Sequence, residues 1–426
     1  MQTTLRPVEL DRAQLRRRYL SNRDRTADLF GLVDPSAYYE RPIGLRHPIV
    51  FYEGHIPAFS FSKLVREALR GAHLDPELER LFARGIDPAS VADAARHERA
   101  SWPERAHVQA FAATCDAAVL GALAAADLTD AAASPLLERG QAAFNILEHE
   151  EMHHETLLYM LHRLPLERKA LAGRGAAYVE RDPVASGRAI VPAGRATLGA
   201  KRDVPFAWDN EFDETPVDVA AFEMDVNDVT NGDWLAFVRA GGPVPSFWLE
   251  RDGAFMLLGM FEEMPLPLTW PVYVTQTQAR AYAAWRGGRL PTEAEYHRAA
   301  FGTPSGEERV FPWGDAAPTS AYGNFDFRRF DPEPVGTNPA GASAWGIHDL
   351  VGNGWEWTST PFAPLPGFTP MASYPQYSAD FFDGAHFVVK GASPVTNRHH
   401  VRRSFRNWYR PDYPYVYATF RTVNDS

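Results

Sequence analysis

Two patterns of hydrophobic and polar positions divide this chain near residue 185. From about residue 8 to residue 170, Ala, Leu, Arg and Glu dominate, and apolar residues recur at three- and four-residue spacing in segments such as Glu104–Ala126 and Pro135–Leu164. That period is typical of amphipathic helices. Prolines separate the helical segments, at Pro35, Pro48, Pro76 and Pro103. We expect an up-and-down helical bundle in this half.

The second half has shorter apolar runs and frequent Gly and Pro, and ten of the eleven tryptophans lie beyond residue 200. Ile190–Gly199 resembles a hairpin with a glycine turn. Helices are predicted over Thr230–Ala240 and Thr275–Arg286, and a third helix follows Thr292, the expected N-cap, with Glu295 as its capping-box partner. The chain is therefore predicted to be an α+β protein with two domains, 1–185 and 186–426.

Composition narrows the class of protein. Lys plus Arg number 43 and Asp plus Glu 54, a net charge of −11, which argues against a nucleic acid or an anionic membrane as the partner. No continuous apolar run suggests a membrane-spanning helix, and the charged N-terminus does not resemble a signal peptide. Cys115 is the single cysteine, which excludes an intramolecular disulfide and makes the cytoplasm the expected compartment.

The strongest local signal for chemistry is Glu148-His149-Glu150-Glu151-Met152-His153. On a helix, His149 and His153 lie one turn apart on the same face, so both imidazoles can reach one metal ion, while Glu150 points about 100° away. His55 is a candidate third ligand on an earlier helix. Three histidines with open coordination positions suit a zinc-bound water or an iron that binds O2.

Two other interpretations of this stretch stay open at this point. A Glu- and His-rich segment is also typical of a solvated helix face. The segment His149–His153 also fits the His-Glu-x-x-His pattern of zinc proteases, with Glu150 as the general base. No third ligand follows downstream in the usual context, such as a Gly-x-x-His extension.

The second half carries a series of motifs that resemble the formylglycine-generating-enzyme (sulfatase-modifying-factor) fold, a variant of the C-type lectin architecture. They run in order over residues 188–424: Glu223–Asn227, Trp270–Val272, Ala281–Trp285, Gly288–Glu295, Phe311–Asp315 and Val351–Thr358. The copper-dependent oxidase of that family uses paired cysteines in this domain, and here there are none. The resemblance therefore implies that the chemistry lies elsewhere in the chain.

The helical half resembles the DinB-like metal domain. DinB-like followed by formylglycine-generating-like domains resembles the nonheme iron sulfoxide synthases of ergothioneine and ovothiol biosynthesis, and Leu45–His55 and Leu81–Asp87 look like the ovothiol and fungal-type branch. The resemblance implies that His55, His149 and His153 bind Fe(II), that O2 is a co-substrate, and that the enzyme acts on C2 of the imidazole of hercynine (N-trimethylhistidine).

At two places that concern the sulfur donor, the sequence departs from the mycobacterial-type ergothioneine enzymes. The mycobacterial-type motif Asn-Trp-Asp reads Asn407-Trp408-Tyr409 here, and Met152 stands where that family has a glutamine. The acidic partner for a donor amino group is missing, which favours the selenoneine synthase branch, with a selenosugar as donor. The alternative is an ergothioneine-type sulfoxide synthase that uses cysteine or γ-glutamylcysteine.

The same resemblance implies roles for further residues. Trp408 and Tyr409 are expected to form an aromatic wall for the trimethylammonium group, and Asn407 an amide contact. Arg403 and Arg406 are candidates to bind a carboxylate. Tyr374 and Tyr377 are candidates for a proton donor or reductant. Aromatic packing and simple charge balance are the alternative explanations of the tryptophan and the arginines.

Two classes of protein compete with this hypothesis. One is a non-catalytic sugar-binding module whose histidines hold structural zinc, and the other is a DinB-type zinc-dependent transferase or hydrolase. The expected partners are small molecules only, without nucleic acid or membrane. A calcium ion in the second domain and the oligomeric state, monomer or dimer, stay open.

Overall fold

The computed structural model describes residues 10–83, 102–170 and 187–426. The described residues up to 170, together with Ala372–Tyr374, form one compact unit, and the remaining residues from 187 onward form a second. The predicted domain boundary at residues 185 and 186 and residues 84–87 of the motif Leu81–Asp87 lie outside the described residues.

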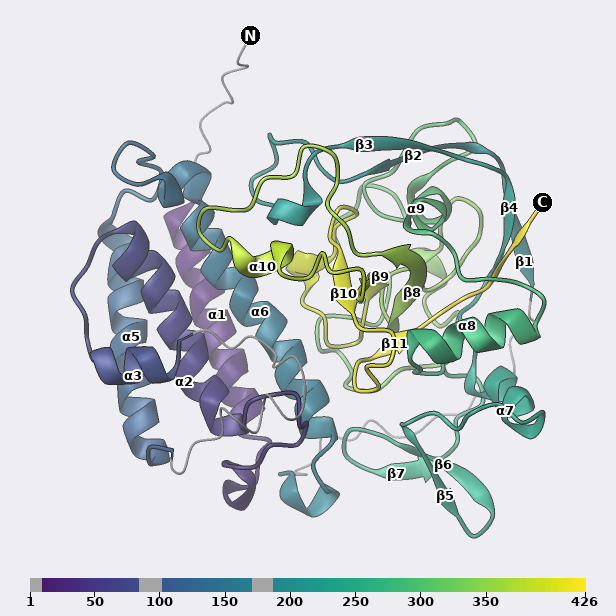
Figure 1. Cartoon of the computed structure of the whole chain (residues 1–426), viewed down its shortest axis with the longest axis horizontal. Coiled ribbons are helices and arrows are strands. Elements are labelled where there is room, and N and C mark those ends of the chain that lie inside the picture. Colours follow the sequence, from purple (N-terminus) through teal and green to yellow (C-terminus); the bar gives the residue numbers. More distant parts are fainter. Residues whose placement is uncertain (1–9, 84–101, 171–186) are drawn as a thin grey trace. The chain divides into compact units, whose positions relative to one another are not determined.

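The first unit is a bundle of helices (Figure 1). Its long helices are α1 (Arg12–Phe30), α2 (Ile49–Ser60), α5 (Arg105–Ala125) and α6 (Gln141–His162), and α3 is Pro76–Leu81. A π-helix, Phe61–Ala68, continues α2. α2 packs against α5 and α6, and α1 packs against the same two helices. The predicted helix over Pro135–Leu164 begins six residues late, because Pro135–Gly140 forms a 3₁₀ segment in which Arg139 and Gly140 have positive φ.

By length and composition, α5 could cross a membrane, so the prediction that no segment could do so was too strict. The core helix of a bundle meets the same criteria. α5 packs against α1 and α2, and its Asp116 accepts hydrogen bonds from Tyr19 and Arg23 of α1. These polar contacts inside the bundle are typical of a core helix.

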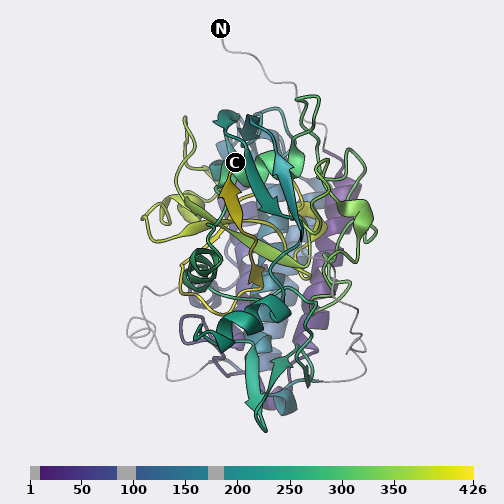
Figure 2. The same ribbon diagram turned by 90° about the vertical axis from the view of Figure 1, so that its right-hand side faces the viewer.

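The second unit is built from short strands, three longer helices and the short helix α10 (Gln376–Ala379). One sheet has the order β10-β9-β8-β11, with β8 at Gly354–Pro361, β9 at Phe387–Ala392, β10 at Asn407–Tyr409 and β11 at Ala418–Thr419. A second sheet has the order β1-β4-β12, and β5, β6 and β7 form a third. The bounds of their strands are Arg188–Val191, Phe222–Asp225, Val423–Asp425, Trp248–Arg251, Ala254–Leu258 and Glu263–Pro265. Figure 2 shows the third sheet as a teal ribbon at the bottom of the view.

The predicted hairpin over Ile190–Gly199 is wrong. β1 pairs with β4 and β2 (Gly194–Leu198) pairs with β3 (Thr215–Val219), in one antiparallel register that runs from Arg188 opposite Asp225 to Leu198 opposite Thr215. The segment is therefore one long strand interrupted at residues 192 and 193. Pro192 has no N–H to donate to the ladder, which explains the interruption.

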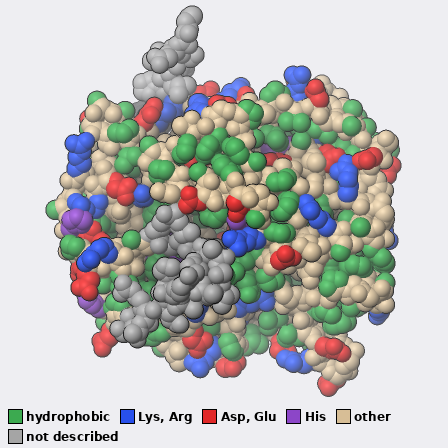
Figure 3. Space-filling view, in the orientation of Figure 1, with side chains coloured by type: hydrophobic (Ala, Val, Ile, Leu, Met, Phe, Trp, Pro, Cys, Tyr) green, Lys and Arg blue, Asp and Glu red, His purple; other side chains and the backbone are tan. Residues whose placement is uncertain are grey.

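The three helices predicted in this half are confirmed. They are α7 (Asn231–Arg239), α8 (Gln276–Trp285) and α9 (Glu293–Phe301), and each begins with a capping box, at Thr230, Thr275 and Thr292. α9 packs against β2, β3, β8 and β9. A hydrophobic core including Phe222, Tyr296 and Leu350 holds these elements together. On the face in Figure 3, acidic and basic side chains are interspersed.

Candidate metal centre

Three histidines of the helical unit converge. His55 comes from α2, and His149 and His153 come from the same face of α6; the ligand atoms of the three lie within 4.8 Å of one another. The Nε2 atoms of His149 and His153 are 3.1 Å apart. Nitrogens of two imidazoles bound at right angles to one metal ion, each about 2.1 Å from it, are about 3.0 Å apart. The three residues named from the sequence are therefore brought together in a geometry that one ion fits.

The hydrogen bonds of the rings also fit a metal. The Nδ1 of His55 donates to the carbonyl oxygen of Phe82 over 2.9 Å, which leaves its Nε2 with a lone pair. The buried Nδ1 atoms of His149 and His153 have no hydrogen-bond partner among the described residues. Two neutral imidazoles that face each other through Nε2 can share at most one proton, whereas a cation between them satisfies both lone pairs.

The environment keeps the three imidazoles neutral. Burial lowers the pKa of His55 to about 4. Burial, together with the neighbouring histidines, holds the pKa values of His149 and His153 well below their usual range. A neutral imidazole is the form that binds a metal, so these side chains are ready to do so at pH 7.

Aromatic rings enclose the triad. Phe59 stacks on His149 with ring centroids 3.5 Å apart, and Phe51 stacks on His55 at 4.8 Å. The ring centroid of Tyr52 lies 5.5 Å from that of His153. These ring contacts restrict the orientation of the three imidazoles.

Glu150 points away from the three histidines of the triad. Its Oε1 accepts hydrogen bonds from Arg23 at 2.8 Å and from Thr26 at 2.6 Å, both on α1, and its side chain is fully buried. A protease base must face the metal-bound water. The geometry therefore argues against the zinc-protease interpretation.

Of the two tyrosine candidates, Tyr374 lies near the triad. Its ring centroid is 6.3 Å from that of His149 and 5.3 Å from that of Phe59. Tyr377 is buried in the second unit, where it stacks on Trp208 at 3.9 Å. Met152 precedes His153 on α6 and is half-buried.

Trp408 is part of an aromatic cluster in the second unit. It stacks on Phe362 at 4.1 Å and lies edge-on to Tyr377 at 5.3 Å. The ring of Tyr409 instead lies parallel to that of Tyr413 at 6.0 Å, and its hydroxyl accepts a hydrogen bond from Asn407 at 3.2 Å. The structure thus groups Trp408 with Tyr377, and Asn407 with Tyr409.

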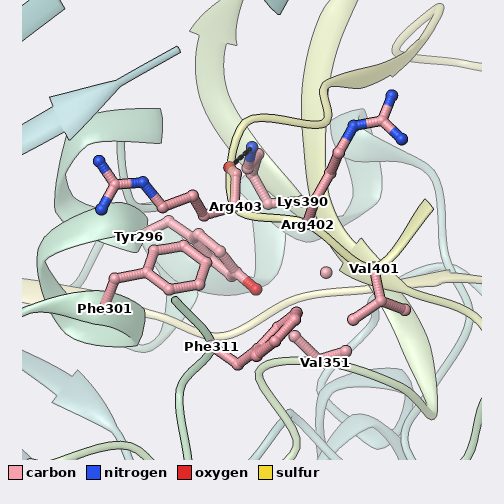
Figure 4. A pocket seen from close by; sticks show the side chains of 9 residues that line it. Tyr296, Phe301, Phe311, Val351, Lys390, Val401, Arg402 and Arg403 are labelled. Carbon is pink, nitrogen blue, oxygen red and sulfur yellow. Dashed lines mark hydrogen bonds between the residues drawn. The ribbon is translucent and has the colours of Figure 1, made fainter. Parts of the chain in front are cut away.

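The two arginines have other partners. Arg406 is buried and makes a two-pronged ion pair with Glu293, at 2.9 and 3.1 Å, and its Nη1 donates to backbone carbonyls. Arg403 pairs with Glu308 at 3.2 Å. Figure 4 shows the guanidinium groups of Arg402 and Arg403 directed away from the small cavity between Tyr296 and Val401. That cavity measures about 10 Å³, room for no more than one water molecule.

Several residues of the centre escape sequence reasoning. Phe82 orients His55 through a backbone carbonyl, which carries no side-chain signal. Asn145 donates a hydrogen bond to Ser373, and the Nζ of Lys63 lies 5.6 Å from the ring centroid of Tyr374, but in the sequence both look like ordinary helix residues. The spacing of Asn145 four residues before His149 is the one available hint that it shares the face of the ligands.

Comparisons with known proteins agree with this architecture. Residues 176–426 match the family described as "Sulfatase-modifying factor enzyme 1-like domain", and residues 18–157 match the DinB superfamily. The predicted fold class, a DinB-like bundle followed by a formylglycine-generating-enzyme-like domain, is confirmed.

Two similar proteins are named hercynine oxygenase. That of Mycolicibacterium thermoresistibile is 36% identical over 99% of this chain and 92% of its own length. That of Mycobacterium tuberculosis is 35% identical over 83% of this chain and 89% of its own length. Ergothioneine biosynthesis protein 1 of Neurospora crassa is 27% identical over 91% of this chain and 55% of its own length. The chain belongs to the hercynine oxygenase family and is an oxidoreductase of that family.

Proposed function

We propose that this protein is a mononuclear nonheme iron enzyme that uses O2 to form a carbon–chalcogen bond at C2 of the imidazole of hercynine. The single observation that carries the proposal is the convergence of His55, His149 and His153, with the Nε2 atoms of the α6 pair 3.1 Å apart, in a chain 36% identical to a hercynine oxygenase. Three protein ligands leave coordination positions for substrates.

The proposed reaction couples formation of the C–X bond to the reduction of one O2. The C2–H bond of hercynine and the X–H bond of the donor break, where X is sulfur or selenium, and a C–X bond forms. One oxygen atom of O2 ends on X as the sulfoxide or selenoxide, and the other leaves as water. Fe(II) bound to the triad would supply the activation of O2.

The protein's own residues supply positioning and proton control. The rings of Phe51 and Phe59 stack on two ligand imidazoles and restrict their orientation. Tyr374, 6.3 Å from His149, is the proposed proton donor or reductant. Trp408, named from the resemblance, stays the proposed aromatic contact for the trimethylammonium group, a contact that contributes about 0.5–2 kcal/mol.

We propose a selenosugar as the donor because Tyr409 is an uncharged residue where an amino-bearing donor requires a carboxylate. The phenol of Tyr409 is already hydrogen-bonded to Asn407, and its ring face is stacked on Tyr413. The second candidate donor is cysteine or γ-glutamylcysteine, which is favoured by the similarity to ergothioneine biosynthesis protein 1. Calcium in the second unit, the cytoplasmic location and the oligomeric state stay predictions.

The test is turnover by protein loaded anaerobically with Fe(II) and supplied with hercynine, O2 and one donor at a time. We expect O2 consumption and a hercynine adduct, detected by mass spectrometry, with the selenosugar preferred. A preference for cysteine or γ-glutamylcysteine would assign the thiol-using activity. Stoichiometric zinc with no O2 consumption would instead support the zinc-holding binding module.

A further inference from the structure

A short segment from late in the chain joins the helical unit. Ala372–Tyr374 lies between β8 and β9 in sequence but clusters with the helices. The Nδ2 of Asn145 on α6 donates to the Oγ of Ser373 over 3.2 Å. Asn145 is 0% exposed and Ser373 is 1% exposed. A hydrogen bond between buried groups is costly to lose, because each partner is left without water.

This hydrogen bond connects two parts of the metal centre. Asn145 precedes His149 by one helical turn, so the two side chains lie on the same face of α6. Ser373 precedes Tyr374, whose ring lies 5.3 Å from Phe59 and 6.3 Å from His149. The helix that carries two of the three histidines thus also holds the segment that carries the tyrosine.

A cation also lies close to the ring of the tyrosine. The Nζ of Lys63 is 5.6 Å from the ring centroid of Tyr374 and 5.8 Å from that of Phe59, and it pairs with Glu67 at 2.9 Å. Lys63 belongs to the π-helix Phe61–Ala68, a form of helix that is frequent at functional sites. An ammonium over an aromatic face is attractive, so Lys63 supports the placement that Ser373 sets.

We propose that Asn145 is a positioning residue that, through Ser373, holds the phenol of Tyr374 beside His149 for the reaction. The inference rests on the proposed function and adds to it a residue that touches neither substrate nor metal. Misplacement of a reacting group by about 1 Å can cost about 100-fold in rate. Loss of this hydrogen bond is therefore expected to lower kcat without changing the metal site.

The kinetic test is a double-mutant cycle in the Fe(II)-loaded full chain. Ser373→Ala should lower kcat about tenfold or more and leave the KM for hercynine and the affinity for Fe(II) within about twofold. In a Tyr374→Phe background the same Ser373→Ala change should alter kcat less than about twofold, because the group it positions is gone. Ser373→Thr, which keeps the hydroxyl, should recover most of the activity, and Thr114→Ala, an exposed hydroxyl deletion on α5, is the control.

A second measurement needs neither metal nor turnover. Tetranitromethane should nitrate Tyr374 several-fold faster in Ser373→Ala and in Asn145→Ala than in the wild-type protein, measured by peptide mass spectrometry against the exposed Tyr39 as the internal reference. Unchanged nitration of Tyr374 in the variants would overturn the positioning role of Asn145 and Ser373. So would an equal loss of kcat on Ser373→Ala in the wild-type and in the Tyr374→Phe background. If wild-type protein does not turn over hercynine, the proposed function fails. The nitration rate would still test whether Ser373 and Asn145 hold Tyr374 in place.

Discussion

The Nδ1 of His55 donates to the carbonyl oxygen of Phe82, and the ring of the same Phe82 lies against the backbone of Gly54. A Cβ at position 54 would lie 2.5 Å from the Phe82 ring carbons. The backbone of Phe82 thus orients the candidate ligand His55, and the ring of Phe82 leaves room only for glycine at position 54.

Gly54→Ala should therefore damage the metal site without touching a ligand. The added methyl group displaces Phe82 and its carbonyl. We expect a loss of about 1–3 kcal/mol of stability from overpacking and a loss of metal affinity of about 10–100-fold. Urea unfolding and Fe(II) titration measure the two effects.

Gly121→Ala is the matched control, since a Cβ at position 121 of α5 meets nothing within 4 Å. That variant should be as stable as the wild type or more stable by up to about 1 kcal/mol. Equal metal affinity in the two glycine variants would show that Phe82 does not orient His55.

The sequence predicts those parts of the metal centre whose residues are close together in the chain. The pair His149 and His153 is visible because ligands on one helix face must be four residues apart. His55 is a candidate from its place on an earlier helix, but no periodicity links it to α6, so only the resemblance assigns it to the same ion. The contacts of Phe82, Lys63 and Ser373 depend on tertiary packing and on a backbone carbonyl. The helices that begin with capping boxes are predicted correctly because those signals are local. The strand Arg188–Leu198 is not, because its pairing partner lies at residues 215–225.

The stability of the metal-free helical unit should fall as the pH falls. The folded-state pKa of His55 is about 4, below the value of about 6.5 in the unfolded chain. Between these values only the unfolded chain binds the proton, so stability present at pH 7 is lost progressively from about pH 6.5 to about pH 4, by up to about 3 kcal/mol for this one group. Urea unfolding at pH 7.5 and pH 5, followed by the circular dichroism of the helices, measures the loss. A His55→Asn variant should lose less over the same interval, and an identical pH dependence would contradict the assignment.

The two arginines named as carboxylate-binding candidates should behave differently. Arg406→Ala removes the two-pronged partner of buried Glu293 and leaves only Lys390, 4.0 Å away, which is expected to cost about 3–5 kcal/mol of stability. Arg403 is partly exposed and pairs with Glu308, so Arg403→Ala should cost about 1 kcal/mol or less. Thermal unfolding compares the two variants. A large increase in the KM for hercynine in Arg403→Ala, without loss of stability, would assign that arginine to substrate binding.

Donor selection should depend on Tyr409. Tyr409→Asp places a carboxylate where the mycobacterial-type motif has one, so the ratio of kcat/KM for cysteine or γ-glutamylcysteine to that for the selenosugar should rise about tenfold. Tyr409→Phe removes only the hydroxyl that accepts from Asn407 and serves as the control. An unchanged ratio in Tyr409→Asp would mean that the donor is selected by other residues.

Anaerobic titration of the metal-free protein with Fe(II) tests most directly whether His55, His149 and His153 share one ion. We expect one equivalent bound to the wild type and to His107→Ala, which changes an exposed histidine of α5. In His149→Ala and in His153→Ala we expect an affinity at least about 100-fold weaker, with the helical content retained. Binding of one equivalent with unchanged affinity in either triad variant would contradict a shared metal site.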